Sequence, residues 1–531
     1  MNVPLSVFEF RDRAELYFRD KIGVIDGDQS FTYGQYAERT HKLANALRGL
    51  GVQKGDRVSF ICYNTHHLLE AYYGVLEAGA ILNPINIRLA PSEIAYILNH
   101  AASKVLFYHQ DFAQLVAGVK SSLAATQHWV VVDGQAGGLA THDYEGLLAT
   151  GSPDYVPPDF DENDIAELFY TSGTTGQPKG VALTHRSLHL HGVYSALALK
   201  FGDDDVIIHV VPLFHSNGWG IPHSITMQGG THVMLRKFDL IALLELIQKY
   251  RATYLFGVPL IFNALINLPT IDQYDLSSIK YLLTGGSAIS PALIQAMQDK
   301  LGKGKTLSIV GYGMTETSPL LAFAWPRQHL NARDTPRQAL ERRALTGWPV
   351  AGIQMRVVDQ QGRDVRPDGQ HLGEIIVRSN TVMHSYYQDP EATAAALREG
   401  WFHTGDMAVM DDQGYVLIKD RSKEIIISGG ENISSSEIEN TLAAHPAVLE
   451  CAVVAAPDDQ WGEIPIAFVV LKPGQAADAD DLLAHCRARL AGFKIPKRVE
   501  FREALPKGGT GKILKAELRE PFWQGQDKRV H

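Results

Sequence analysis

A loop rich in glycine and hydroxyl side chains sets the strongest limit on what this chain can fold into. Residues 170–180 read Tyr-Thr-Ser-Gly-Thr-Thr-Gly-Gln-Pro-Lys-Gly, directly after an apolar stretch at 166–170 that predicts a strand. Glycines allow backbone amides to turn toward an anion, hydroxyl groups add donors, and Lys179 adds a positive charge. A Walker A loop is excluded, because it needs adjacent Gly and Lys followed by Ser or Thr. The pattern predicts a phosphate-binding loop that lies between a strand and a helix beginning after Thr184.

Strands and helices alternate on both sides of this loop. Apolar positions at helical spacing predict helices at 31–50, 66–78, 91–101, 240–250 and 291–300. Short apolar runs predict strands at 57–62, 81–85, 104–108, 206–210, 231–235, 253–256, 280–283 and 306–310. This alternation predicts an α/β fold, with parallel sheets flanked by helices on both faces.

The pattern changes twice in the second half of the chain. Over about 347–420, short strands separated by turn signals predict a β-rich subdomain. From about residue 421 onward, helices expected at 436–444 and 477–490 mix with strands expected at 451–456, 466–471 and 497–501. This last region is long enough for a small α+β domain.

Composition excludes several classes of function. The 531 residues carry a net charge of −10, so a general affinity for nucleic acid or anionic membrane is not expected. The three cysteines (Cys62, Cys451 and Cys486) are too few for a disulfide scaffold and match no zinc motif. Charged residues fill the N-terminus where a signal peptide would be apolar, and no apolar run is long enough to span a membrane. A cytoplasmic protein is therefore expected.

Further motifs, in order along the chain, resemble those of the adenylate-forming superfamily. This superfamily includes acyl-CoA synthetases, luciferases of the firefly type and the adenylation domains of peptide synthetases. The loop at 170–180 resembles its signature. The other matching segments are 212–219 (Pro-Leu-Phe-His-Ser-Asn-Gly-Trp), 285–287 (Gly-Gly-Ser), 311–316 (Gly-Tyr-Gly-Met-Thr-Glu), 401–406 (Trp-Phe-His-Thr-Gly-Asp), 420–423 (Asp-Arg-Ser-Lys), 428–432 (Ser-Gly-Gly-Glu-Asn) and 506–512 (Pro-Lys-Gly-Gly-Thr-Gly-Lys).

The resemblance implies domains and a nucleotide site. It implies an AMP- and acyl-binding domain at 1–420, a hinge at 421–423 and a mobile domain at 424–531. The ATP- and AMP-binding residues would be Thr171, Ser172, Gly173, Thr174, Thr175, Gly176, Lys179, Gly285, Gly286, Ser287, Gly311, Tyr312, Gly313, Met314, Asp406 and Arg421. In chemical terms, the ring of Tyr312 can stack on adenine, Asp406 can accept ribose hydroxyls, and the Arg421 guanidinium can bind ribose or phosphate oxygens. Thr171 and Glu316 would hold Mg²⁺, which prefers oxygen ligands.

Roles in catalysis also come from the resemblance. The catalytic residues would be Lys512, His215, Thr315 and Glu316, with Lys512 bridging the substrate carboxylate and the α-phosphate. Lys423 would be the hinge residue. Ser428, Gly429 and Gly430 would contact CoA after the mobile domain swings. ATP, CoA and a small carboxylic acid are the expected substrates.

The expected acid is a medium- or long-chain fatty acid. Members that activate amino acids carry Asp in the segment of His215, which this chain lacks, and acetyl-CoA synthetases carry a closing Trp where Gly313 stands. Trp219 has the spacing of the tryptophan that gates the acyl tunnel in long-chain enzymes. The acyl pocket would include Trp219, Gly220, Val258 and Gly313.

Other substrates and reactions stay open. A CoA ligase for a smaller, aromatic or methylthio-alkanoic acid is an alternative, and so is an acyl-adenylating enzyme that does not use CoA. By analogy with long-chain relatives, the chain could form a homodimer through its N-terminal domain.

Overall fold

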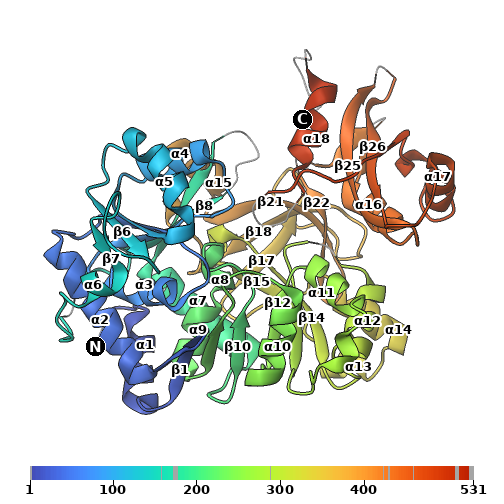
Figure 1. The fold of residues 1–531 in the computed structure, drawn as a ribbon. Helices are drawn as coiled ribbons and strands as arrows, with labels where there is room; N and C mark the ends of the chain where they lie inside the picture. Colours follow the sequence, from blue (N-terminus) through green and yellow to red (C-terminus); the bar gives the residue numbers. More distant parts are fainter. Residues whose placement is uncertain are drawn as a thin grey trace.

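The computed structural model describes residues 3–156, 158–171, 177–287, 289–422, 424–428, 431–458, 460–508 and 513–524. Over these residues the strands form four sheets, whose arrangement can be followed in Figure 1. Two sheets with flanking helices take up most of the N-terminal part. A third sheet follows them in sequence, and the fourth belongs to the C-terminal region.

The first sheet is parallel through its centre, with antiparallel strands at both edges. In spatial order its strands are β16 (Trp348–Pro349), β15 (Leu320–Phe323), β14 (Leu307–Gly313), β13 (Tyr281–Thr284), β12 (Tyr254–Gly257), β10 (Val206–His209), β11 (Thr231–Met234), β1 (Ile22–Asp26) and β2 (Gln29–Thr32). Parallel strands align their carboxyl ends, so β12, β13 and β14 deliver the segments that follow them to one edge of the sheet.

The second sheet is also mostly parallel. Its strands, in order, are β19 (Ser385–Tyr386), β9 (Lys179–Thr184), β8 (Ile165–Thr171), β4 (Ile81–Pro84), β3 (Arg57–Ile61), β5 (Ser103–His109), β6 (His128–Val132) and β7 (His142–Asp143). Strand β9 pairs antiparallel with β8, whereas the sequence predicted no strand at 179–184. The helix predicted after Thr184 is confirmed, because it begins at His185, where the Thr184 side chain accepts a hydrogen bond from the Ser187 amide.

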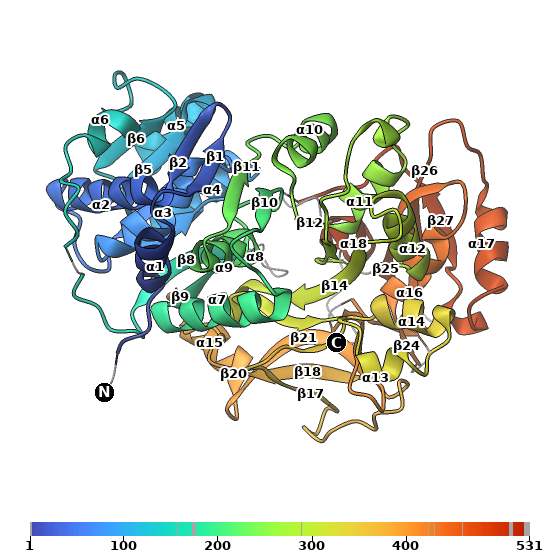
Figure 2. The same cartoon turned by 90° about the horizontal axis from the view of Figure 1, so that it is seen from below.

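Helices flank both sheets, as Figure 2 shows from below. They are α1 (Phe8–Phe18), α2 (Tyr33–Gly49), α3 (His66–Glu77), α4 (Pro91–His100), α5 (Ala113–Val119), α6 (Tyr144–Leu148), α7 (His185–Leu199), α8 (Ser216–Trp219), α9 (Ile221–Gln228), α10 (Leu240–Tyr250), α11 (Pro259–Ile266), α12 (Pro291–Lys300), α13 (Gln328–Asn331), α14 (Pro336–Arg343) and α15 (Pro390–Ala396). The largest apolar core lies around α2, α3 and α7, and every residue of α3 is buried.

The third sheet confirms the predicted β-rich region. It consists of β17 (Gln354–Val358), β18 (Gly373–Arg378), β21 (Trp401–Met410), β20 (Leu397–Arg398) and β22 (Val416–Arg421), all antiparallel. Strand β22 ends at the residue where the sequence predicts the hinge. The chain then enters the C-terminal region at the upper right of Figure 1.

The C-terminal region has an α+β fold, as predicted. Its sheet contains β24 (Glu431–Ile433), β23 (Ile426–Ser428), β26 (Gly462–Leu471), β25 (Val448–Asp458) and β27 (Arg498–Phe501). Its helices are α16 (Ser435–Ala443), α17 (Ala479–Arg487) and α18 (Lys515–Trp523). Apolar clusters on both faces of this sheet give the region a core of its own. The domain boundaries at 420 and 424 stay predictions.

Two expectations from composition are also met. All three cysteines are described, and none is in a disulfide. Over the described ranges, no helix combines the length and the apolar character needed to cross a membrane.

Candidate active site

One large cavity collects most of the residues that the sequence singles out. Its volume is about 1920 Å³, and its lining comes from the first three sheets and from the C-terminal region. The predicted site residues that line it are Thr171, Lys179, His215, Trp219, Val258, Gly285, Gly286, Ser287, Gly311, Tyr312, Gly313, Met314, Thr315, Glu316 and Arg421. Segments that are up to 250 residues apart in sequence therefore meet at one site.

Several predicted residues lie outside the described part of the chain. They are Ser172, Gly173, Thr174, Thr175, Gly176, Lys423, Gly429, Gly430 and Lys512. Described residues on either side of 509–512, Gly508 and Ile513, line the cavity. Ser428, which the sequence places in a CoA contact, is buried in β23 and is absent from the cavity lining.

Strands β14, β21 and β22 bring together the residues expected to hold the nucleoside. Asp406 lies opposite Arg421 across the β21–β22 pair, and the Arg421 Nε lies 3.4 Å from the Asp406 Oδ1. The Tyr312 hydroxyl donates a hydrogen bond of 2.6 Å to the other oxygen of Asp406. Burial, followed by the Asp406 charge, raises the pKa of Tyr312 well above its usual value, so the hydroxyl stays a donor.

Glu316 sits in a short helical turn directly after β14 and is buried. The Tyr386 hydroxyl donates to its Oε1 at 2.9 Å, and the Lys179 ammonium lies 5.2 Å from the centre of the Tyr386 ring. Burial raises the pKa of Glu316, because a charged carboxylate loses its hydration there. A bound cation would offset that loss. Glu316 and the Thr171 hydroxyl, both on the cavity wall, therefore fit a hard cation such as Mg²⁺.

His215 and Trp219 flank an unusual turn on the cavity wall. Both side chains are partly buried, and both line the cavity. The turn between them is fixed to the predicted nucleotide site, because the Ser216 and Thr315 hydroxyls are hydrogen-bonded at 2.7 Å. This hydrogen bond links the His215 segment to the 311–316 segment.

A buried polar group behind this turn was missed by sequence reasoning. Glu167, fully buried in β8, accepts hydrogen bonds from Asn217 Nδ2 at 2.9 Å and from His223 Nε2 at 3.1 Å. The sequence did carry a signal, because Glu167 interrupts an otherwise apolar strand. Tyr386, the partner of Glu316, was also missed, and its tyrosine-rich surroundings give no comparable signal.

Two family profiles cover most of the chain. The profile described as AMP-binding enzyme matches residues 10–387. The profile described as AMP-binding enzyme C-terminal domain matches residues 437–512. This chain belongs to the AMP-binding enzymes.

Full-length relatives of this AMP-binding enzyme carry different substrate names. A long-chain-fatty-acid–CoA ligase of Thermus thermophilus is 38% identical over 533 residues, covering 98% of this chain and 96% of the relative. A 3-methylmercaptopropionyl-CoA ligase of Ruegeria pomeroyi is 37% identical, covering 98% of each chain. A crystal structure of an anthranilate CoA ligase in complex with anthranoyl-AMP superposes with a TM-score of 0.90 at 28% identity, covering 99% of this chain and 98% of that one.

Two glycines of the predicted acyl pocket leave little room for a side chain in this AMP-binding enzyme. A Cβ atom at Gly313 would lie 2.1 Å from the Pro319 carbonyl oxygen, because β15 pairs closely with β14 there. A side chain at 313 would therefore meet the Pro319 backbone, whereas the resemblance led us to expect that it would project toward the start of the acyl chain. A Cβ at Gly220 would lie 1.9 Å from the His191 ring, and Gly220 does not contribute to the cavity lining. Gly220 therefore packs against His191 and is not part of the cavity surface.

An ion-pair cluster ties the predicted hinge to the C-terminal helices. The Lys515 ammonium donates to Ser435 Oγ at 2.6 Å and to Glu439 Oε1 at 2.8 Å. Asp420 accepts hydrogen bonds from the amide and the hydroxyl of Ser435, both at 2.6 Å. Burial raises the pKa of Glu439 to about 7, against the pull of Lys515. The end of β22 is thereby linked to α16 and α18.

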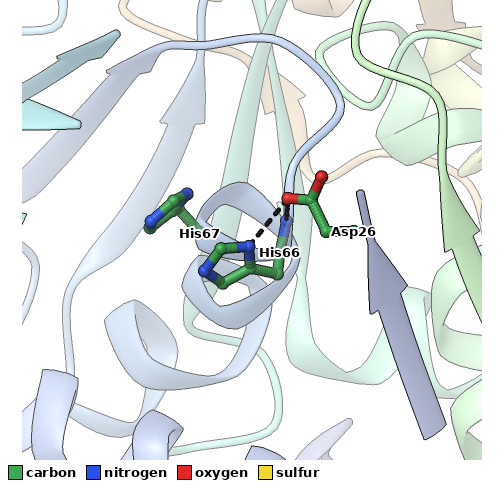
Figure 3. Close-up of side chains that lie close together, drawn as sticks. All are labelled: Asp26, His66 and His67. Atoms are coloured by element: carbon green, nitrogen blue, oxygen red, sulfur yellow. Dashed lines mark hydrogen bonds and ion pairs between the residues drawn. The ribbon is translucent and has the colours of Figure 1, made fainter. Parts of the chain in front are cut away.

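A second polar cluster lies away from the cavity lining, where β1 meets α3 (Figure 3). Asp26 accepts hydrogen bonds from the backbone and the Nδ1 of His66 and from Arg236. Burial opposes ionisation of Asp26, but these donors hold its pKa at about 2. The rings of His66 and His67 lie against each other at a tilt of 35°, with centroids 3.7 Å apart, and the carboxylate is already paired with a guanidinium. The group is therefore better suited to bracing β1 against α3 than to holding a cation.

Proposed function

We propose that this enzyme joins a medium- or long-chain fatty acid to CoA in two steps. In the first step, a carboxylate oxygen of the acid attacks the α-phosphorus of ATP, and pyrophosphate leaves. In the second step, the CoA sulfur attacks the acyl carbon of the acyl-adenylate, its proton is released, and AMP leaves. The broader activity, that of an AMP-forming acid–thiol ligase using ATP and CoA, is the activity of this branch of the family.

The chemistry requires charge stabilisation, because a carboxylate must approach the polyphosphate of ATP. Lys179 on the cavity wall supplies one positive charge, and Mg²⁺ held by Glu316 and Thr171 would supply a second. His215 lies on the same wall, where it can orient the acid. Lys512 is proposed to bridge the carboxylate and the α-phosphate, and the proposal is supported by Gly508 and Ile513, which line the cavity.

The apolar part of the cavity is the observation that favours a fatty acid as the substrate. Apolar lining residues come from the segment after β10, from β12 and the residue after it, and from α9 and α11: Val210, Val211, Phe214, Trp219, Ile221, Phe256, Val258, Leu260, Ile261 and Ala264. An unsubstituted hydrocarbon chain gains about 0.8 kcal/mol for each methylene buried on such a surface. A second charged group on the acid would lack a partner among these residues.

A smaller, aromatic or methylthio-alkanoic acid is the second candidate. The relatives support it as well, because the long-chain ligase and the methylmercaptopropionyl-CoA ligase are 38% and 37% identical to this chain. Sequence identity therefore does not distinguish the two kinds of substrate. A CoA-independent acyl-adenylating enzyme is the third candidate. Family membership alone is compatible with it, and nothing about the cavity favours it.

Domain rotation and assembly complete the proposal. The chain would bend at 421–423, with Lys423 as the hinge, so that Gly429 and Gly430 reach the acyl-adenylate when CoA enters. A homodimer through the N-terminal domain is proposed by analogy alone.

The test is a two-part assay of the purified enzyme. Pyrophosphate release is measured with ATP, Mg²⁺ and saturated acids of two to sixteen carbons, benzoate and 3-methylthiopropionate, with and without CoA, and the thioester is identified by mass spectrometry. We expect the highest kcat/KM with acids of eight carbons or more, and thioester formation only with CoA. A preference for benzoate or methylthiopropionate would replace the fatty-acid proposal. Pyrophosphate release without any thioester would remove CoA from the reaction.

A further inference from the structure

The wall between His215 and Trp219 is a left-handed turn. Residues 216–220, which include the segment α8, all have positive φ, with values of 47°, 39°, 58°, 63° and 73°. Only glycine adopts this region freely, and asparagine tolerates it better than most residues. A bulky residue there is an outlier, and here that residue is Trp219, whose side chain lines the cavity.

Strain of this kind persists only where surrounding contacts hold it. The turn is held at three points. Ser216 is hydrogen-bonded to Thr315, and Asn217 donates to Glu167. At the far end, the His191 ring packs so closely on Gly220 that no Cβ could be added.

The middle contact involves a buried carboxylate. Glu167, Asn217 and His223 are each fully buried, so the carboxylate has lost its hydration and depends on these donors. Because a carboxylate only accepts, His223 Nε2 carries the proton, and its Nδ1 is then free to accept from the Tyr73 hydroxyl 3.2 Å away. Hydrogen bonds to buried charges are worth more than those between neutral groups.

The position of Glu167 links two parts of the site. It lies four residues before Thr171 on β8, the strand that leads into the phosphate-binding loop. Asn217 lies two residues before Trp219, whose Cη2 would be 3.6 Å from a Cβ at Gly285. One hydrogen bond therefore joins the strand of the phosphate loop to the turn that aims the tryptophan.

We infer that Glu167 is a positioning residue that, through Asn217, fixes Trp219 against the acyl pocket and thereby sets which acyl chains are accepted. This inference rests on the proposed acyl-CoA ligase function. Neither Glu167 nor Asn217 is required to touch the substrate. With the hydrogen bond intact, Trp219 has one position, and the pocket discriminates between chain lengths. Without the hydrogen bond, the turn can relax to ordinary backbone angles, and Trp219 no longer holds a fixed position at the edge of the acyl pocket.

The decisive variant is Asn217→Gly, because glycine keeps the left-handed backbone without strain and removes only the side-chain donor. If the side chain matters, the ratio of kcat/KM between the preferred acid and an acid four carbons longer or shorter should fall by about tenfold, the usual weight of a hydrogen bond to a charged group. The KM for ATP should stay near that of the wild type. Thermal unfolding of each variant reports whether the fold is kept.

Glu167→Gln and Glu167→Ala form a matched pair. Glutamine has the same shape and can still accept from Asn217, so it should keep the wild-type chain-length profile. Alanine removes the acceptor and should reproduce the effect of Asn217→Gly, and the double variant should be no worse than either single one. If Glu167→Ala fails to fold, Asn217→Gly and Glu167→Gln still decide the question.

A wild-type profile in Asn217→Gly would overturn the inference, because the turn would then need only a residue that tolerates positive φ. An equal loss of activity with every acid would also overturn it, since the contact would then support catalysis in general. Failure of the proposed function looks different, because the wild type itself would then reject fatty acids. In that case the same variants are compared on the series of acids that the wild type does accept.

Discussion

The Tyr312 hydroxyl donates a hydrogen bond of 2.6 Å to the Asp406 carboxylate, and this bond joins β14 of the first sheet to β21 of the third. Arg421 approaches the same carboxylate from β22. The orientation of Asp406 therefore depends on two sheets at once. A nucleoside that binds both the Tyr312 ring and Asp406 would contact both sheets, so its affinity would depend on their relative position.

Tyr312→Phe should weaken ATP binding while keeping the ring. Loss of a hydrogen bond to a charged group predicts a rise in the KM for ATP of about tenfold, with a smaller change in kcat. Pyrophosphate release as a function of ATP concentration measures it. Tyr415→Phe is the matched control, because the Tyr415 hydroxyl donates to the Trp325 carbonyl oxygen and Tyr415 lies outside the cavity lining. Equal effects of the two substitutions on the KM for ATP would contradict the assignment of Asp406 to the nucleotide site.

Lys512→Ala should abolish adenylation and spare thioester formation. The physical reason is that the proposed bridge between carboxylate and α-phosphate exists only in the first step. Each step is measured separately, with pyrophosphate release for the first and synthetic acyl-AMP plus CoA for the second. Lys497→Ala, at an exposed position of the C-terminal region outside the cavity lining, is the control and should keep both steps. A Lys512→Ala enzyme that fails equally with acyl-AMP would contradict the two-conformation assignment.

Lys423→Pro should hold the enzyme in one conformation. Proline fixes φ near −65° and removes the amide donor, so a backbone that must take two conformations is locked. We expect acyl-AMP to form and stay bound, while the thioester is lost. Rapid-quench analysis of enzyme-bound acyl-AMP provides the measurement. An overall rate near the wild-type value would place the hinge elsewhere.

Local patterns in the sequence were enough for most of the main helices and strands. Residues 66–77 and 240–250, for example, form the helices that their apolar spacing predicts, because such periodicity is a local property. Strand β9 was missed because residues 179–184 follow the loop with a short apolar run, which only its pairing with β8 identifies as a strand. The β1–β2 hairpin was missed in the same way, although Gly27 at φ 64° marks its turn.

The site was predictable where chemistry is carried by consecutive residues and not where it depends on side-chain direction. The 311–316 segment lines the cavity as expected. The direction of residue 313 is set by β15, which pairs with β14 and places the Pro319 carbonyl against it, and no spacing rule reveals that contact. The Glu167–Asn217 bond likewise joins residues fifty positions apart, so only the fold brings them together.

Gly313 and Val258 should respond differently to larger side chains. Even Gly313→Ala forces the Pro319 backbone to move, so adenylation of every acid should fall together with the thermal midpoint. Val258→Trp instead fills space on the apolar wall. If it displaces room for four methylenes, long acids should lose about 3 kcal/mol, on the order of a hundredfold in kcat/KM, while short acids are spared. An unchanged chain-length profile in Val258→Trp would mean that the acyl chain does not bind next to α11.

The Asp26 group should make stability depend on pH at the acidic end. The pKa of Asp26 is lowered from 3.8 to about 2 in the folded protein, where burial is outweighed by donors from His66 and Arg236. A lowered pKa contributes stability that is complete above the unfolded value and is lost as pH falls through the folded value. The contribution is up to roughly 2 kcal/mol at neutral pH, with about half of it gone at pH 3.

Asp26→Asn should therefore destabilise the protein more at pH 7 than at pH 3, as measured by urea unfolding at both values. Asp28→Asn, at an exposed position in the neighbouring turn, is the control and should show no such pH dependence. A destabilisation by Asp26→Asn that is the same at both pH values would mean that packing, and not the charge on Asp26, holds β1 against α3.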